Sequence, residues 1–350
     1  MFFERHWYRA SYTWLTGLCL PLSWLFRSLV AFRYFLYRIK LKNTVHFPVP
    51  IIVVGNITVG GTGKTPFVIW LADMLRRKGY RPGIVSRGVG GKKIRAPFWV
   101  EANSNPALVG DEALLLVRRA QCPLVVCIDR ARAVKELLSK TDCDVVISDD
   151  GLQHYRLGRD LEIAIVDASR LFGNKSLLPA GPLREPIKRL KRVDFVVVNG
   201  LEQQCNARFH EKITPMHLVG DTLVSLQDSQ RMMPLEGFKQ QTVHAVVGIG
   251  NPKRFLSSLS TKQINLVPHV FPDHYLYGRD DIHFADDSPV IMTEKDAVKC
   301  FKFASKQHWY LPVKAKLGEE LENKICNRLR MCAPAPVINK KIRTPYETAN

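Results

Sequence analysis

The most specific chemistry in the sequence lies in a glycine-rich loop, which reads GGTGKT over residues 60–65. It follows an apolar run at 51–54 and precedes an amphipathic helical pattern, the context that a phosphate-binding P-loop requires. Backbone N–H groups of such a loop point at phosphates, Lys64 can reach the terminal phosphates, and the Thr65 hydroxyl is placed for Mg²⁺. Thr58 replaces the first glycine of the strict pattern, but the other three glycines keep the cradle. The predicted nucleotide-binding residues are Thr58, Val59, Gly60, Gly61, Thr62, Gly63, Lys64 and Thr65.

Two adjacent carboxylates, Asp149 and Asp150, directly follow the apolar run VVIS. The carboxyl end of a parallel strand faces the ligand crevice, and a carboxylate there can hold Mg²⁺ directly or through water. Asp-Asp-Gly is also typical of a turn, so either residue alone could be a turn or cap residue.

Three further residues have both a chemical and a structural interpretation. Asp111 and Glu112 open a helical pattern, where carboxylates are favoured in any first turn by capping and by the helix dipole. His274, in VFPDHYLY, could exchange a proton near neutral pH, although a single histidine after Pro-Asp is more often structural. The sequence alone leaves both alternatives open.

The charge of the chain indicates an anionic partner. A net charge of +19 is compatible with nucleic acid, an anionic membrane or a phosphorylated substrate. Nucleic acid is disfavoured because no zinc-ligand spacing, RRM signature or RGG tract is present. A basic cluster could be either an anion site or a solvated helix face, and it comprises Arg184, Lys188, Arg189, Lys191 and Arg192.

The N-terminus carries an apolar segment. Residues 10–26 are 17 consecutive uncharged residues, followed by several basic ones. This run is short for a membrane-spanning helix, which needs about 20 apolar residues, and a central arginine would cost roughly 2.5 to 3.5 kcal/mol. We expect a membrane-associated interfacial helix over residues 1–42, the alternatives being a core helix or a signal peptide without its small-residue cleavage site. Eight cysteines without a CxxC pair predict reduced thiols and a cytosolic environment.

The elements that must position these residues follow a βα rhythm. Strand-like Val- and Ile-rich runs alternate with helical patterns, which is typical of an α/β fold with a mainly parallel, P-loop NTPase-like sheet flanked by helices. We expect this core over 43–209, a linker over 210–242, a second, smaller α/β domain over 243–338 and a loose tail over 339–350.

The order of several motifs resembles the tetraacyldisaccharide 4'-kinase family, the lipid A 4'-kinases of Gram-negative bacteria. These motifs cover most of the chain and are GNITVGGTGKTP (55–66), VSRGVGG (85–91), GDEALLL (110–116), ISDDGLQH (147–154), LLPAGPLREP (177–186), GIGNPKRF (248–255), FPDH (271–274) and TEKDAVK (293–299). Two departures, Ala113 where many members have Pro and Val89 where an aromatic is common, remove no catalytic group.

The resemblance implies an enzyme that transfers the γ-phosphate of ATP to the 4'-hydroxyl of a tetraacylated disaccharide 1-phosphate, at the cytoplasmic face of the inner membrane. It implies ATP and Mg²⁺, an anionic lipid-sugar substrate and a peripheral or monotopic attachment, with no nucleic acid and no obligate protein partner. By position, Asp111 matches the catalytic base and His274 its charge partner, with Lys64 neutralising phosphate charge. The positions near Mg²⁺ are Thr65, Glu112 and Asp150, and the other active-site positions are Asp149, Arg184 and Glu185.

The competing hypothesis is a membrane-bound P-loop ATPase or GTPase switch that has no small-molecule acceptor. ATPases of this class carry a lysine immediately before the first glycine of GGxGKT. Val59 occupies that place here, which counts against that class.

Overall fold

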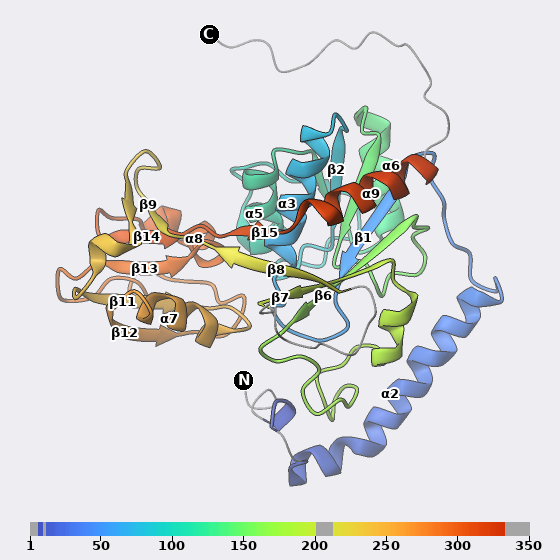
Figure 1. Cartoon of the computed structure of the whole chain (residues 1–350), viewed down its shortest axis with the longest axis horizontal. Coiled ribbons are helices and arrows are strands. Elements are labelled where there is room, and N and C mark those ends of the chain that lie inside the picture. The colour runs from blue at the N-terminus through green and yellow to red at the C-terminus, as the bar shows by residue number, and fades with distance from the viewer. Residues whose placement is uncertain (1–5, 10–11, 201–212, 333–350) are drawn as a thin grey trace.

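The chain forms a larger and a smaller α/β lobe, with a long N-terminal helix at one side of the larger lobe (Figure 1). The computed structural model describes residues 6–9, 12–200 and 213–332. It confirms the expected fold class, a mainly parallel P-loop-type sheet with helices, a second smaller sheet and an apolar N-terminal helix.

The larger lobe is organised around a nine-stranded sheet in the order β15-β8-β7-β6-β1-β5-β2-β4-β3. Its seven inner strands are parallel, whereas the two edge strands, β15 and β3, run antiparallel to their neighbours. The strands are β1 (Ile51–Gly55), β2 (Pro82–Ser86), β3 (Phe98–Trp99), β4 (Leu124–Val126), β5 (Val145–Asp149), β6 (Leu161–Asp167), β7 (Phe195–Asn199), β8 (Ile213–Val219) and β15 (Lys314–Lys316).

Helices cover both faces of this sheet because its central strands are apolar on both sides. Ile52 and Val54 of β1 pack with α3, α5 and α9, whereas Ile51 and Val53 pack with α6 and η1 on the opposite face. The helices of the lobe are α3 (Lys64–Arg77), α4 (Pro106–Val109), α5 (Asp111–Ala120), α6 (Arg130–Lys140), the 3₁₀ helix η1 (Ile187–Arg192) and α9 (Glu319–Cys332).

The smaller lobe contains a six-stranded sheet in the order β10-β9-β14-β13-β11-β12. The last four strands in this order are parallel, and β9 and β10 add an antiparallel edge. Its elements are β9 (Thr222–Ser225), β10 (Met232–Pro234), η2 (Leu235–Phe238), β11 (Thr242–Val247), α7 (Pro252–Ser260), β12 (Asn265–Val270), β13 (Val290–Thr293), α8 (Glu294–Cys300), η3 (Phe301–Phe303) and β14 (His308–Leu311).

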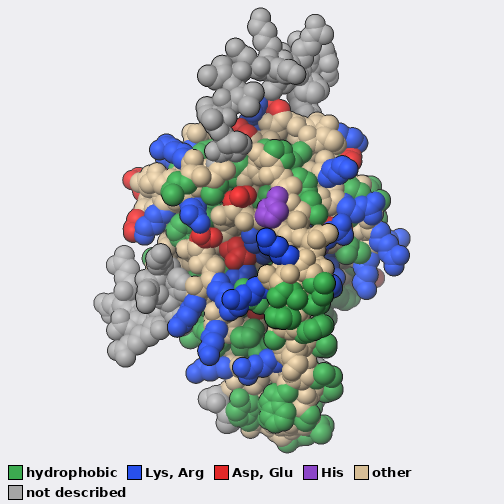
Figure 2. Space-filling view, turned by 90° about the vertical axis from the view of Figure 1, so that its right-hand side faces the viewer, with side chains coloured by type: hydrophobic (Ala, Val, Ile, Leu, Met, Phe, Trp, Pro, Cys, Tyr) green, Lys and Arg blue, Asp and Glu red, His purple; other side chains and the backbone are tan. Residues whose placement is uncertain are grey.

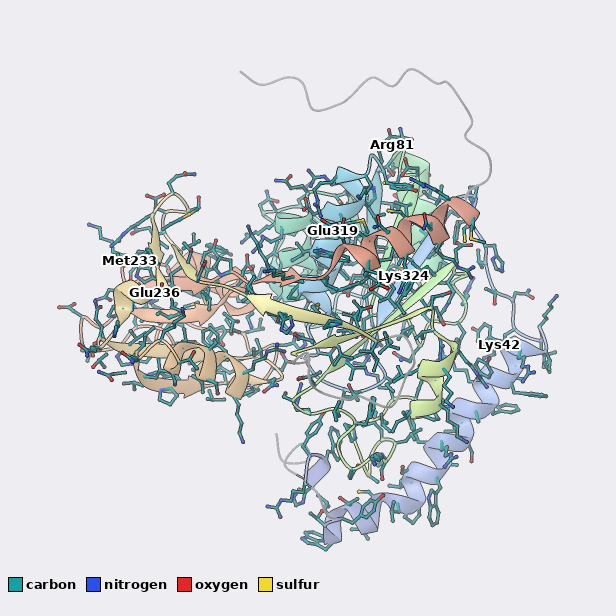
Figure 3. The ribbon with its side chains drawn as sticks, in the orientation of Figure 1. Lys42, Arg81, Met233, Glu236, Glu319 and Lys324 are labelled. Atoms are coloured by element: carbon teal, nitrogen blue, oxygen red, sulfur yellow. The ribbon has the colours of Figure 1, made fainter. Side chains whose placement is uncertain are left out.

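The chain passes between the lobes differently from the expectation. The segment 210–242, expected as a linker, contains β8 of the larger sheet and β9 and β10 of the smaller one. The C-terminal part of the expected smaller domain returns to the larger lobe as β15 and α9. In Figure 3, Glu319 and Lys324 mark α9 on the larger lobe, and Met233 and Glu236 mark the outer part of the smaller lobe.

Strand β8 was missed because it lies near the sheet edge and buries only one of its residues fully, so its sequence ITPMHLV lacks an apolar run. The expected tail over 339–350 lies outside the described residues.

Helix α2 (Trp14–Arg38) is longer than the uncharged run that indicated it. One side touches the larger lobe, where Ser23 Oγ donates to Leu177 O at 2.8 Å and Phe26 packs on the core. Its other side exposes a stripe of large apolar side chains, which includes Trp14, Leu18, Leu22, Leu25 and Leu29. By length and composition, α2 is the one helix among the described residues that could cross a membrane.

Candidate active site

The P-loop connects β1 to α3 and is braced from two sides. Gly63 precedes α3 with a φ of 94°, and a Cβ placed there would lie 2.4 Å from Asn199 Nδ2, so the position requires glycine. Thr58 pairs in an antiparallel bridge with Leu183, and Val59 N donates to Pro182 O at 2.8 Å. This pairing explains why the loop does not need the first glycine of the strict pattern.

Asp150 is held by two cations at the carboxyl end of β5. Lys64 Nζ lies 3.5 Å from Asp150 Oδ1, and Arg184 Nη1 donates to Asp150 Oδ2 at 3.0 Å. Burial alone would raise the pKa of Asp150, but the charges of Lys64 and Arg184 outweigh it and hold this pKa far below its usual range. Asp150 is therefore ionised and already paired.

Asp149, the neighbouring residue, has the opposite environment. Its Oδ2 accepts a hydrogen bond from Ser86 Oγ at 3.1 Å, but its buried Oδ1 has no partner among the described residues. Burial and the negative charges of Glu112 and Asp150 raise its pKa to about 7. A buried carboxylate oxygen without a donor is costly, so this corner of the site is suited to a cation.

The oxygen donors here fit Mg²⁺ rather than a soft metal. Thr65 and Glu112 both line one cavity beside the P-loop, and hydroxyl and carboxylate oxygens are the ligands that Mg²⁺ prefers. Among the described residues, no three His, Cys, Asp or Glu side chains converge as a ready-made metal cage. Mg²⁺ is commonly held by one or two carboxylates together with water and phosphate oxygens.

The structure brings Asp111 and His274 together, although 163 positions separate them. His274 Nδ1 lies 2.8 Å from Asp111 Oδ1 and 3.1 Å from Oδ2. Asp111 is the first residue of α5 and is nearly fully buried, and the α-carbon of Gly90 packs against the pair. The pair therefore lies at a helix N-terminus, where the dipole favours a carboxylate.

The charge state of this pair is set by several cations. Burial would raise the pKa of Asp111, but the hydrogen bond from His274 and the charges of Lys295, His274 and Lys299 lower it to about 2. Burial likewise opposes protonation of His274, and its hydrogen bond to Asp111 outweighs that effect and raises the pKa of His274. The favoured state is an aspartate beside a histidine that readily carries a proton.

Two lysines of α8, which were given no role from the sequence, complete this end of the site. Lys295 Nζ donates to Glu112 Oε1 at 2.9 Å and to Asp273 Oδ1 at 3.0 Å. The buried Lys299 lies 3.5 Å from Asp111 Oδ2 and 3.0 Å from Asp296 Oδ1. The signal in the sequence was the four-residue spacing of two lysines in TEKDAVK, which places both on one helix face.

Glu185 and the basic cluster belong to a network beside the site. Glu185 is buried, accepts from Gln153 Nε2 at 2.9 Å and from the Tyr155 hydroxyl, and lies 3.8 Å from Arg189 Nε. Arg189 also pairs with Glu162. The cluster is therefore not simply a solvated face, since Arg184 and Arg189 form ion pairs while Lys188, Lys191 and Arg192 are exposed.

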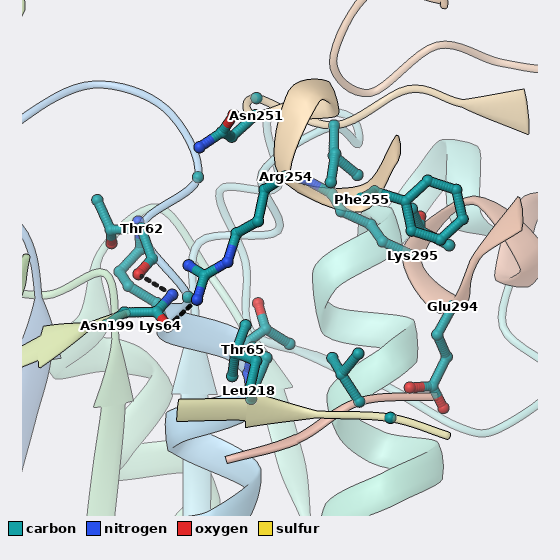
Figure 4. A pocket seen from close by; sticks show the side chains of 18 of the residues that line it. Thr62, Lys64, Thr65, Asn199, Leu218, Asn251, Arg254, Phe255, Glu294 and Lys295 are labelled. Atoms are coloured by element: carbon teal, nitrogen blue, oxygen red, sulfur yellow. Dashed lines mark hydrogen bonds between the residues drawn. The ribbon is translucent and has the colours of Figure 1, made fainter. Parts of the chain in front are cut away.

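A cavity of about 250 Å³ lies between the P-loop and the smaller lobe (Figure 4). Strand-end residues Asp167 of β6 and Asn199 of β7 line it with Arg254 of α7, and none of the three was anticipated. Polar residues at the ends of the predicted strands IAIVD and FVVVN were the available signal. Its apolar lining suits a flat aromatic or sugar group and comes from Ile69, Leu115, Leu218, Ile249, Phe255, Leu311 and Val313.

One face of the molecule shows these groups together. In Figure 2, acidic side chains and a histidine lie in the middle of the face, lysines and arginines surround them, and a hydrophobic projection extends below. The projection lies at the lower end, where Figure 1 has α2.

Comparisons with known proteins agree with one another. A sequence profile of the family described as tetraacyldisaccharide-1-P 4'-kinase matches residues 15–330. Tetraacyldisaccharide 4'-kinases from Nitrosococcus oceani and Coxiella burnetii (strain RSA 331) are 47% identical over 330 residues and 48% identical over 319 residues. These matches cover 94% and 91% of this chain, and 94% and 92% of those proteins.

A solved structure is also similar, the "apo" form of LpxK from Aquifex aeolicus in complex with ATP. Its TM-score is 0.75 at 32% sequence identity, and the match covers 90% of this chain and 99% of that one. Since the profile spans most of the sequence and the relatives match more than nine-tenths of it, the chain belongs to the tetraacyldisaccharide-1-P 4'-kinase family.

Proposed function

We propose that the chain transfers the γ-phosphate of ATP to the 4'-hydroxyl of tetraacyldisaccharide 1-phosphate in lipid A biosynthesis. The observation that carries this proposal is the adjacency of Asp111 and Glu112 at the start of α5. Asp111 makes the contact with His274, and Glu112 lines the cavity that contains Lys64 and Thr65. An acceptor-activating group and a phosphate cradle therefore occur in one site.

At the nucleotide end, backbone N–H groups of residues 60–65 and Lys64 bind the phosphates. Thr65, Glu112 and Asp149 or Asp150 would hold Mg²⁺, which when bound supplies positive charge to the phosphates. Asp149 is the stronger candidate of the two aspartates because its Oδ1 has no described partner, whereas Asp150 is paired with Lys64 and Arg184.

At the acceptor end, Asp111 orients the 4'-hydroxyl and accepts its proton late in the transfer. A strong base is not required, because the transition state of phosphoryl transfer is loose and catalysis is mostly alignment and charge stabilisation. His274 and Lys299 lie against the Asp111 carboxylate and keep it ionised until the proton arrives. Glu185 acts as a positioning residue through Gln153 and Tyr155.

We propose that the enzyme lies on the cytoplasmic face of the inner membrane, with α2 in the plane of the interface rather than across the bilayer. The helix contacts the protein through Ser23 and Phe26, and Arg33 Nη2 donates to Gln153 O at 3.0 Å. The exposed apolar stripe on its other side is available to lipid. The site would then face a substrate that resides in the bilayer.

A liposome flotation assay tests this attachment. Charges at two positions of the stripe, Leu18→Glu and Leu25→Glu, should release the protein from anionic vesicles because each charge opposes insertion of the apolar face. Met232→Glu is the matched control, since Met232 is as exposed as Leu25 but lies on the smaller lobe. Continued flotation of the double variant would contradict the proposed role of α2.

The experiment for the activity uses detergent-solubilised protein, γ-labelled ATP, Mg²⁺ and tetraacyldisaccharide 1-phosphate. Label should appear on the lipid, and removal of Mg²⁺ with a chelator should prevent its transfer. Hydrolysis of ATP without labelled lipid, even with the disaccharide present, would instead support a P-loop switch.

A further inference from the structure

Arg254 of α7 is a cation of the smaller lobe that extends into the P-loop cavity (Figure 4). Its Nη2 donates to Asn199 Oδ1 at 2.7 Å, and Asn199 Nδ2 in turn donates to Thr62 O at 3.0 Å. Arg254 is thus one side chain away from the backbone of the phosphate loop.

The charge of Arg254 is not balanced by an ion pair. Within residues 6–9, 12–200 and 213–332, no carboxylate lies within salt-bridge distance of its guanidinium, whereas Lys64, Arg170 and Arg184 each have an aspartate. Burial lowers the pKa of Arg254, and Asp167 opposes this only from a distance. A half-buried guanidinium without a counter-charge is unfavourable unless an anion joins it.

The position of Arg254 relative to the P-loop is well fixed. The loop that precedes α7 packs directly on the phosphate loop, since a Cβ on Gly250 would lie 2.6 Å from Gly61 N. Arg170 joins the two loops by donating to Gly61 O and to Gly250 O, each at 2.7 Å. These contacts hold the first turn of α7, and with it Arg254, beside the phosphate cradle.

We infer that Arg254 binds the polyphosphate of the nucleotide, as a second cation that the smaller lobe adds to Lys64. Arginine has five N–H donors in a fixed fork, and among the described residues only one hydrogen bond, to Asn199, uses them. The remaining donors match phosphate oxygens, which guanidinium groups bind in bidentate fashion. This inference rests on the proposed function, because it takes ATP to be the nucleotide.

The part of the ATP affinity that Arg254 contributes would depend on the phosphates and not on the base or ribose. The apolar part of the cavity would still bind adenosine without it. Removal of the guanidinium should therefore lower the affinity for ATP selectively, and a lysine, which keeps the charge but not the fork, should restore part of that affinity.

The test measures the dissociation constants of ATP and adenosine by calorimetry, in the absence of lipid. The proteins compared are wild type, Arg254→Gln and Arg254→Lys. Arg254→Gln should weaken ATP binding by about 10- to 100-fold, the range for a charge-assisted hydrogen bond, and leave adenosine binding unchanged. The ATP affinity of Arg254→Lys should lie between those of wild type and Arg254→Gln. Lys253→Gln is the matched control, since it removes the same charge from the exposed neighbouring position and should leave both affinities unaltered.

Two outcomes would overturn the inference. An equal loss of adenosine and ATP affinity would show that Arg254 only supports the cavity through Asn199, and an unchanged ATP affinity would show that it does not touch the phosphates. Thermal unfolding of each nucleotide-free variant checks that the fold is intact. Failure of the proposed function is distinguishable, because a chain that binds ATP but does not label the lipid would still give this pattern of affinities.

Discussion

Asp111 and Asp149 are both almost fully buried in the same site, yet the structure treats them in opposite ways. Cations of the smaller lobe, namely His274, Lys295 and Lys299, surround Asp111 of the larger lobe, and its pKa is lowered to about 2. Asp149 lies among carboxylates, has one oxygen without a described partner, and its pKa is raised to about 7. The charges of the proposed acceptor end are balanced within the protein itself, whereas the proposed nucleotide end would be completed by the ligand that binds there.

The two carboxylates should therefore affect stability in opposite directions as pH changes. For Asp111 the pKa in the folded state lies below the ordinary value of 3.8. The ionised carboxylate therefore stabilises the fold above about pH 4, and this stabilisation is lost as pH falls toward 2. For Asp149 the folded pKa lies above 3.8, so ionisation destabilises the fold increasingly as pH rises from about 4 to about 7.

The largest effect is expected at the acceptor end. Asp111→Asn should lower the rate of lipid phosphorylation by roughly 100- to 10,000-fold, the usual contribution of a general base, because the amide cannot accept the proton of the hydroxyl. The affinity for ATP should hardly change, since Asp111 lies at the acceptor side. Steady-state kinetics with the lipid, together with calorimetry of ATP binding, measure the two effects separately.

The control for this variant is another aspartate–histidine pair. Asp286 Oδ1 lies 2.7 Å from His244 Nε2 in the smaller lobe, outside the site, so Asp286→Asn makes the same chemical change without touching the reaction. If Asp111→Asn lost ATP affinity as strongly as it lost turnover, Asp111 would belong to the nucleotide end together with Asp149. The contrast between Asp111 and Asp149 would then fail.

The sequence predicted the two ends of the site unequally. The P-loop is contiguous, and Asp149 and Asp150 directly end a recognisable strand, so local pattern was sufficient to find them. The family and the fold class indicated by the motifs are confirmed by the comparisons. The roles of the individual site residues stay predictions.

The acceptor end could not be derived from local pattern because it is assembled from two lobes. The sequence alone left both Asp111 and His274 with a chemical and a structural interpretation, and only the resemblance paired them, because no local pattern predicts that a helix start and a distant loop will meet. Lys295, Lys299 and Arg254 lie on helices α7 and α8, whose orientation depends on how the lobes pack. Strand β8 was also missed partly for this reason, because its pairing partners, β7 and β15, lie in two different parts of the chain.

A smaller effect, on stability rather than turnover, is expected at the nucleotide end. Without Mg²⁺ and nucleotide, Asp149→Asn should raise the free energy of unfolding by about 1 to 3 kcal/mol at pH 7, because the neutral amide avoids the cost of a buried negative charge without a partner. The gain should be small near pH 4, grow as the pH rises toward 7 and then level off, because only the wild-type side chain ionises in that range. Urea unfolding in a chelator at several pH values measures it.

Asp150→Asn is the matched control for this prediction, since it is the same substitution at the next residue. It should lower stability, because it removes the charge that pairs with Lys64 and Arg184. Addition of Mg²⁺ and nucleotide should then stabilise the wild type more than Asp149→Asn, which lacks the carboxylate that the cation would join. If Asp149→Asn were as destabilising as Asp150→Asn, Asp149 would already be satisfied within the protein, and the nucleotide end would be as complete in itself as the acceptor end.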